Sequence, residues 1–181
     1  MTTLRNAMIG VGGLLVLAAC GNPAAPGATS QTTKAATTAA KNGWNPLDAC
    51  ATLGKDAASR ISGSPVTSTE LSPVVPGTDA SAAFSMCTFK LADGGQLMLL
   101  TREAPFADAT PQSIEKSRTA DGTLPPATDV PGLGKAAMWS DTTKGLQVFI
   151  DDTRYLSINY TGLPGDETGK DRAIAVAKVL L

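Results

Sequence analysis

Histidine is absent from the 181 residues of this sequence. Its imidazole is the usual general base near neutral pH, the commonest metal ligand and a member of most nucleophilic triads. A chain without histidine lacks the side chain on which active sites and metal centres of those kinds depend. We therefore expect no catalytic residues, no metal and no cofactor.

An excess of basic charge and a supply of aromatic rings are lacking too. Phe, Trp and Tyr make up 4% of the residues, and 15 Lys and Arg stand against 16 Asp and Glu, which gives a net charge of −1. Few rings mean few platforms for stacked bases, and without a basic patch nothing displaces counterions from a phosphate backbone. Nucleic acid is therefore not an expected partner.

The first twenty residues have the pattern of an export signal. Arg5 precedes an apolar run over 7–19, which is too short to span a bilayer as an ordinary helix and suits the core of a signal peptide. The run ends in Leu17-Ala18-Ala19-Cys20, which resembles the bacterial lipobox. That resemblance implies cleavage before Cys20, a diacylglyceryl group on its thiol and acylation of the new amine. The alternatives are an ordinary secretory peptide with an incidental cysteine, or a short membrane helix.

Two or three acyl chains on one residue hold a protein on a membrane durably, whereas one chain anchors it marginally. We therefore expect a signal peptide over 1–19 and a protein anchored in the cell envelope. The anchor would lie on the outer face of the cell membrane, or on an outer membrane if the host has one. Residues 21–43 are mostly small or polar and cannot bury enough surface to fold. We expect the lipidated cysteine and a disordered tether over 20–43, and a single domain over 44–181.

Two segments at the start of this domain are expected to be a helix and a loop. An apolar stripe at helical spacing predicts a helix that starts near Asn45 and ends at Gly63. The members of the stripe are Leu47, Cys50, Gly54, Ala57 and Ile61. A Pro- and Ser-rich loop is expected to follow to about Ala80.

Two further helices are expected later in the chain. A weaker helix is expected over 106–119, where Pro111 limits how early its interior can start. Thr168 and Asp171 are placed to form a capping box at the start of a last helix, whose apolar residues share one face.

Apolar and polar residues alternate in segments that predict antiparallel hairpins. One hairpin joins 82–91 to 96–102, and a second joins 145–151 to 154–161. A short strand is expected over 136–140. Together these elements predict an α+β fold, an antiparallel sheet of hairpins with an N-terminal and a C-terminal helix packed on it.

The three cysteines are Cys20, Cys50 and Cys87. If Cys20 carries the lipid, an even pair remains in an exported, oxidising compartment, as expected for one disulfide. A redox pair is the alternative, but the two residues are not spaced as C-x-x-C and are expected in the core. Two thiolates without histidine make a poor metal site.

Three segments of the domain resemble a broad family of uncharacterised bacterial lipoprotein domains, best populated in actinobacteria. The segments are Asp48-Ala49-Cys50, Cys87-Thr88-Phe89 and 130–137, and the resemblance covers about 44–181. The family usually has tryptophan where this chain has phenylalanine at 89. The resemblance implies one disulfide between helix and sheet. It implies no catalytic residues, because none are established for the family.

Three short motifs suggest chemistry but have simpler interpretations. Residues 132–137 fit G-x-G-x-x-A, yet a Pro-rich loop precedes them and a short strand follows, so a turn is expected instead of a dinucleotide site. Residues 113–116 match S-x-x-K, but the chain has no Lys-Thr-Gly and is too short for a penicillin-recognising fold. The acid pairs Asp151-Asp152 and Asp166-Glu167 fit solvated turn residues better than a hydrolytic dyad.

Trp139 and Tyr155 are the candidates for a binding surface, chosen from the four Trp and Tyr residues. Tyr155 falls on the opposite hairpin face from Leu156 and Tyr160 and is expected to be exposed. An exposed aromatic side chain on a sheet can anchor a partner.

These observations favour a non-enzymatic lipoprotein whose domain binds an envelope protein or a small ligand near the membrane. The first alternative is a carrier of a lipid or other apolar ligand, which needs a cavity of some hundreds of Å³ between helix and sheet. The remote alternative is a hydrolase that uses serine and carboxylates without histidine.

Overall fold

A computed structural model describes residues 43–164 and 169–181. In chain order, its elements are α1 (Ala49–Leu53), α2 (Lys55–Ser62), β1 (Val66–Val75), β2 (Ala83–Leu91), β3 (Gln96–Glu103), α3 (Pro111–Thr119), β4 (Thr128–Asp129), β5 (Ala136–Ser140), β6 (Gly145–Phe149), β7 (Arg154–Thr161) and α4 (Lys170–Leu180). None of the helices in the described ranges is long and apolar enough to cross a membrane.

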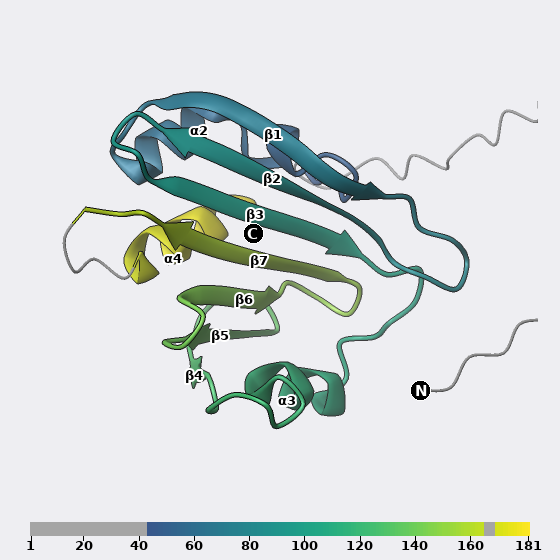
Figure 1. Ribbon diagram of the computed structural model, residues 1–181. Coiled ribbons are helices and arrows are strands. Elements are labelled where there is room, and N and C mark those ends of the chain that lie inside the picture. Colours follow the sequence, from purple (N-terminus) through teal and green to yellow (C-terminus); the bar gives the residue numbers. More distant parts are fainter. Residues whose placement is uncertain (1–42, 165–168) are drawn as a thin grey trace, which may run out of the picture. The chain divides into compact units, whose positions relative to one another are not determined.

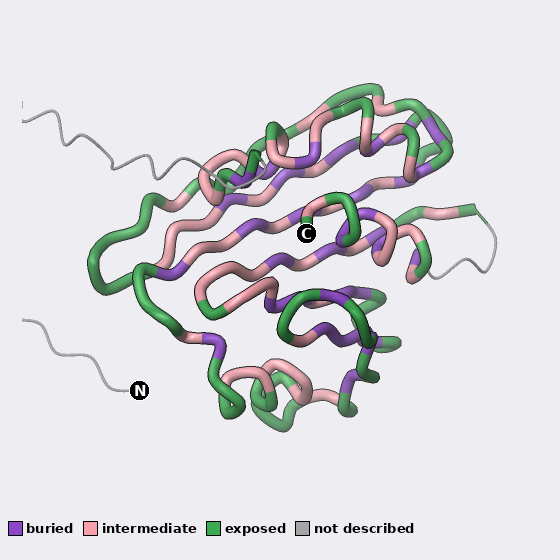
Figure 2. Tube along the Cα trace, turned by 180° about the vertical axis from the view of Figure 1, so that it is seen from behind, coloured by how far each residue is buried: buried purple, intermediate pink, exposed green. Residues whose placement is uncertain are grey.

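The seven strands form one antiparallel sheet in the order β1-β2-β3-β7-β6-β5-β4 (Figure 1). Both expected hairpins are present, as β2–β3 and β6–β7, and they meet where β3 pairs with β7. Helices α1, α2 and α4 lie on one face of the sheet (Figures 1 and 2). The expected α+β fold is therefore confirmed.

The main core lies between these helices and the sheet. Alternate residues of β2, β3 and β7 are buried in it, and Figure 2 shows the alternation along each strand. The helices face the sheet with small side chains that are 0% exposed, namely Ala49, Ala58, Ala173 and Ala177. Small side chains allow close approach of helix and sheet, so the space between them is filled.

A disulfide joins the helical layer to the sheet. Cys50 of α1 is bonded to Cys87 of β2, 37 positions along the chain, with the two Cα atoms 5.0 Å apart. Cys87 is 0% exposed and shares the core face of β2 with Phe89 and Leu91. The pairing expected from the cysteine count, and implied by the family resemblance, is confirmed.

The first helix differs from the expectation in being broken at Gly54, where φ is 76° and ψ is 150°. The residues that it buries are Ala49, Leu53, Ala58 and Ser62, and the expected stripe is half-buried beside them. The N-cap is Asp48, whose carboxylate accepts the N–H of Ala51 at 2.8 Å, and not Asn45. The end at Gly63, in the left-handed conformation, agrees with the sequence pattern.

Part of the segment expected to be a loop up to residue 80 is the edge strand β1. Most of its residues are exposed, Leu71 at 38% and Val74 at 45%, so the strand has no alternating apolar pattern. Pro73 and two register shifts interrupt its pairing with β2, which suits an edge position. The two-residue strand β4 was not expected either.

The last helix starts after Gly169, which has no side-chain cap. Of the expected capping box, Thr168 lies outside the described residues, and Asp171 is in the first turn of α4. The expected face of α4 is partly confirmed, because Ala173 and Ala177 are buried.

Candidate functional site

The second face of the sheet is only partly covered. The α3 segment packs against side chains of β5, β6 and β7. No helix of the described ranges lies over β1, β2 and β3 on this face (Figures 1 and 2). The uncovered side of β2 and β3 carries four apolar side chains, each half-buried. They are Phe84, Met86, Met98 and Leu100, and we call them the open-face cluster.

Strand pairing makes the open-face cluster contiguous. Met86 pairs with Leu100, and Met98 pairs with Thr88, two residues further along β2. Phe84 pairs with Arg102, which in turn pairs with Tyr155 of β7. The cluster therefore continues into the part of the sheet that α3 covers.

Helix α3 begins later than the sequence predicted because Pro111 occupies its first turn. Thr110 caps it, and its hydroxyl accepts the N–H of Ser113 at 3.1 Å. None of its nine residues, all within the described ranges, is buried. The helix contacts the sheet through half-buried Ile114, and its flanking loops hold it as well.

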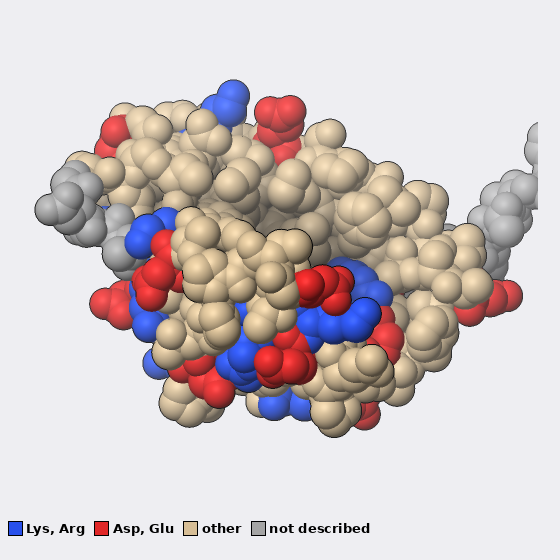
Figure 3. Space-filling model, turned by 60° about the horizontal axis from the view of Figure 1, so that its bottom comes forward, with Lys and Arg blue, Asp and Glu red and all other residues tan. Residues whose placement is uncertain are grey.

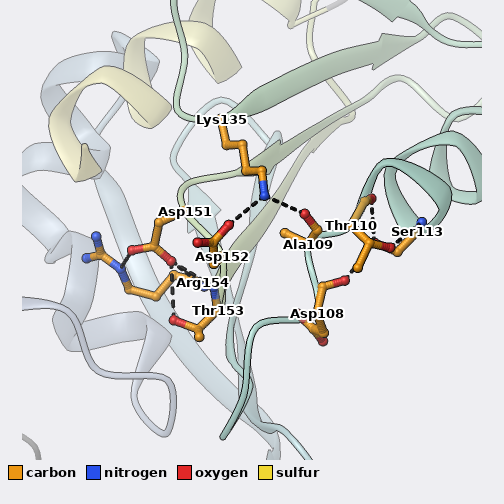
Figure 4. A network of polar contacts seen from close by, with 9 residues as sticks. All are labelled: Asp108, Ala109, Thr110, Ser113, Lys135, Asp151, Asp152, Thr153 and Arg154. Carbon is orange, nitrogen blue, oxygen red and sulfur yellow. Dashed lines mark hydrogen bonds and ion pairs between the residues drawn. The ribbon is translucent and has the colours of Figure 1, made fainter.

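A polar clamp ties the loop before α3 to the turn between β6 and β7 (Figure 4). The Lys135 ammonium donates to the carbonyl of Ala109 at 2.6 Å and to Oδ1 of Asp152 at 2.5 Å. The backbone N–H groups of Asp108 and Ala109 donate to the Asp152 carbonyl at 2.9 and 3.1 Å. The hydroxyl of Ser113 donates to the carbonyl of Asp108 at 2.7 Å, which joins the helix to the clamp.

The carboxylate of Asp151 stabilises the same turn by accepting hydrogen bonds from residues within it. Its Oδ1 accepts the N–H groups of Thr153 and Arg154 at 2.9 and 2.8 Å, and Oδ2 accepts Nε of Arg154 at 2.7 Å. Burial raises the pKa of the Asp151 carboxyl, but these hydrogen bonds and the Arg154 charge outweigh burial and lower it to about 2. The first acid pair thus has the expected turn role, and the second, Asp166-Glu167, lies outside the described residues.

Two hollows lie between α3 and the sheet, with volumes of about 210 and 320 Å³. The first is lined by Arg102, Asp108, Ser113, Ser117, Phe149 and Tyr155. The second is lined by Lys116, Ser117, Ala120, Asp121 and Gln147. Ser117 lines both, so we treat them as one site, the α3 groove. Figure 3 shows acidic and basic side chains intermingled on this side of the molecule.

Tyr155 lies in the α3 groove and is half-buried, not exposed as expected. It does point to the opposite face from Leu156, which is 0% exposed. Its ring meets that of Phe149 edge to face, with centroids 5.1 Å apart. Burial raises the pKa of the Tyr155 hydroxyl to about 12, and the hydroxyl donates to Oε1 of Gln147 at 3.1 Å.

Trp139 is not part of a binding surface, which corrects the sequence prediction. It is 1% exposed and packs in the main core, because both faces of β5 are covered. Its Nε1 donates to Oδ1 of Asp141 at 2.9 Å. Trp44, 3% exposed, and Tyr160, 4% exposed, are core residues too.

The other sequence motifs have structural roles. Residues 132–137 form the tight turn into β5, where a Cβ on Gly134 would lie 2.5 Å from the carbonyl oxygen of Phe149. In the S-x-x-K segment, the hydroxyl of Ser113 is bonded to backbone carbonyls and Lys116 pairs with Asp121. Cys20, the proposed lipid site, lies outside the described residues.

Sequence reasoning missed the open-face cluster and most of the α3 groove. One signal for the groove was present, since Ser113, Ser117 and Ala120 put small side chains on one helical face at spacings of four and three. Within residues 43–164 and 169–181, no group of three or more acidic or cysteine side chains is placed to hold a metal ion. No protein-family model matches the chain, and no curated protein sequence shows a significant match to it.

Proposed function

We propose that this protein is a cell-envelope lipoprotein, anchored through Cys20, whose domain is a non-enzymatic binding module with the open-face cluster as its contact surface. The lipobox-like end of the first twenty residues and the polar tether support the anchor. The family resemblance of the domain supports the same assignment. A tether of about 23 residues averages roughly 25–30 Å end to end, which keeps the domain close to the membrane.

The open-face cluster is the observation that carries the binding role. An antiparallel sheet with one covered face normally presents polar side chains on the other. Here the two inner strands β2 and β3 carry phenylalanine, leucine and two methionines on that face, all half-buried. Contiguous apolar surface of this kind marks interaction sites, and methionine adapts to the shape of its partner. A protein partner in the envelope fits this surface best.

The carrier alternative has less support. It required a cavity between the helices and the sheet, and that interface is filled by side chains such as Ala58, Phe89 and Ala177, each 0% exposed. The hollows described above lie on the opposite face of the sheet. We therefore propose that the binding surface is on that opposite face, which also carries the open-face cluster.

Site-specific crosslinking in the full-length lipoprotein, expressed in its own envelope, tests the binding role. A photoreactive side chain at Met86 or Met98 is expected to capture the same discrete protein. Val179, an apolar residue of α4 that is 54% exposed on the helical side, is the matched control position and is expected to capture none. A capture pattern that is the same at all three positions would contradict the proposal.

A separate measurement tests the anchor. The wild-type protein is expected to partition into the detergent phase with an acylated first residue at Cys20, and Cys20→Ala to stay in the aqueous phase. An unmodified mature terminus at another residue, found by intact-mass analysis, would refute the lipid anchor. It would leave the binding role of the domain to be judged by crosslinking.

A further inference from the structure

Helix α3 packs on the sheet through half-buried Ile114, and none of its residues is fully buried. The side chains that it turns toward the groove are Ser113, Lys116, Ser117 and Ala120, at the spacing of one helical face. On α4 the equivalent face carries Ala173, Val176 and Ala177, all 0% exposed, and the interface is filled. Beneath the serines the sheet supplies Tyr155, which is half-buried, and Phe149, which is 7% exposed. An open groove with hydroxyl groups on its helical wall is the result.

The floor of the groove is aromatic and neutral. The half-buried ring of Tyr155 forms it, and meets edge to face the ring of Phe149, which is 7% exposed. Because burial raises the pKa of the Tyr155 hydroxyl to about 12, the phenol is protonated at neutral pH. Its proton is donated to Oε1 of Gln147, and the amide nitrogen of Gln147 makes no hydrogen bond within the described residues. Two amide N–H donors are therefore free for a ligand.

The charges that line the groove are balanced. Arg102 is paired with Asp108, and Lys116 is paired with Asp121 at 3.4 Å. A charged ligand would meet no uncompensated charge and would have to displace one partner of a pair. Each pair still has unused donors on its cation and unused lone pairs on its carboxylate. The hydroxyl of Ser117 makes no hydrogen bond within the described residues and is also free to donate and accept.

We propose that the α3 groove binds a neutral saccharide, with one sugar ring against Tyr155 and its hydroxyl groups on Ser117, Gln147 and the ion pairs. A sugar ring combines an apolar C–H face with hydroxyl groups that both donate and accept, which matches this mixture. One hollow, of about 210 Å³, is smaller than the roughly 300–1,000 Å³ of ordinary ligand clefts, and the other, of about 320 Å³, is at the lower end of that range, so they suit one or two rings. The inference rests on the proposed binding role and names a ligand for the covered part of the same face.

Saturation-transfer NMR on the acylated full-length protein in detergent micelles tests the inference. The neutral probes are maltotriose, cellotriose and the trimer of N-acetylglucosamine, and a galacturonic acid trimer is the charged control. At least one neutral trimer is expected to bind saturably, and at least tenfold more tightly than the charged trimer. Parallel sedimentation with insoluble starch, cellulose and chitin separates a polymer ligand from a free oligosaccharide.

Two variants of α3 place the binding in the groove. Ser117→Leu fills the groove with an apolar side chain and is expected to weaken binding at least tenfold without lowering the melting temperature. Gln112→Leu makes the same kind of change at an exposed residue of α3 that lines neither hollow, and is expected to bind as wild type. Absence of binding by all neutral trimers, or equal binding by Ser117→Leu, would overturn the inference. Capture of a protein at Met86 and Met98 without saccharide binding would remove this inference and leave the proposed function standing.

Discussion

The backbone N–H of Ala49 donates a hydrogen bond to the hydroxyl of Ser85 at 2.9 Å, and both residues are 0% exposed. The next residue of the helix, Cys50, is bonded to Cys87 on the same face of β2. A helix of five residues cannot persist alone, because its nucleation cost is not recovered over so few hydrogen bonds. Two adjacent attachments to one strand hold α1 in place.

Replacing Ser85 by alanine removes the acceptor of a buried N–H group. An unsatisfied buried donor costs about 1–3 kcal/mol, so we expect Ser85→Ala to lower the free energy of unfolding by that amount. Urea denaturation measures the change. Ser68→Ala, at an exposed position of β1, is the matched control and is expected to change stability by less than about 0.5 kcal/mol. Equal costs at the two positions would show that the Ala49 hydrogen bond is unimportant.

The disulfide is expected to supply a large share of the stability of the domain. Closing a loop of this length stabilises the fold by about 4 kcal/mol in the chain-entropy model, against a typical total of about 5–15 kcal/mol. Cys50→Ala and Cys87→Ala are each expected to lower the melting temperature by roughly 10 °C or more. The double variant should add little, because either change removes the whole bond.

Thiol labelling of the exported protein distinguishes a structural bond from a redox pair. The native domain is expected to label only after denaturation with reductant, since Cys87 is 0% exposed. Two thiols that react in the native protein would show that the bond is absent in the cell, whatever its effect on stability in vitro.

The parts of the fold that follow from the sequence are those in which one face of an element is buried. In β2 and β7 every second residue points into the main core, so the strands show the alternation from which both hairpins were predicted. The end of the helical region could be predicted too, because Gly63 adopts the left-handed conformation that glycine favours.

The remaining parts depend on contacts that no local pattern shows. β1 is exposed along most of its length, so it has no alternation and is held mainly by its pairing with β2. Trp139 looked like a surface anchor because the sequence does not show that β5 is covered on both faces. The α3 groove brings together Arg102, Ser117 and Gln147 from three separate segments, and their meeting depends on the pairing of β3 with β7.

The break at Gly54 gives a prediction about backbone strain. Its φ of 76° with ψ of 150° lies in a region that is essentially restricted to glycine, whereas Gly63, with φ 68° and ψ 13°, has the left-handed helical conformation that asparagine tolerates. A Cβ atom at either position would meet no atom within 4 Å, so contacts of the first side-chain atom do not distinguish the two positions. We expect Gly54→Asn to cost about 1–3 kcal/mol and Gly63→Asn clearly less, measured by urea denaturation. Equal costs would mean that the α1–α2 break adapts to a side chain.

The pKa of Asp151 leads to a prediction about acid stability. The folded-state value of about 2 is below the ordinary value of 3.8, so the native state favours the carboxylate. The resulting stabilisation is fully present above about pH 4 and is lost as the pH falls toward 2. Asp151→Asn keeps an oxygen for the N–H groups of Thr153 and Arg154 but loses the charge that pairs with the Arg154 guanidinium.

We expect Asp151→Asn to be about 1 kcal/mol less stable than wild type near pH 6, after allowing for solvent screening of a side chain that is 43% exposed. The difference between the two proteins should shrink as the pH falls from 4 to 2, because protonation removes the same charge from the wild type. Urea denaturation of both proteins at several pH values measures this difference, and contributions of the other carboxylates cancel in it. A difference that stays constant down to pH 2 would show that the Arg154 charge does not stabilise the turn.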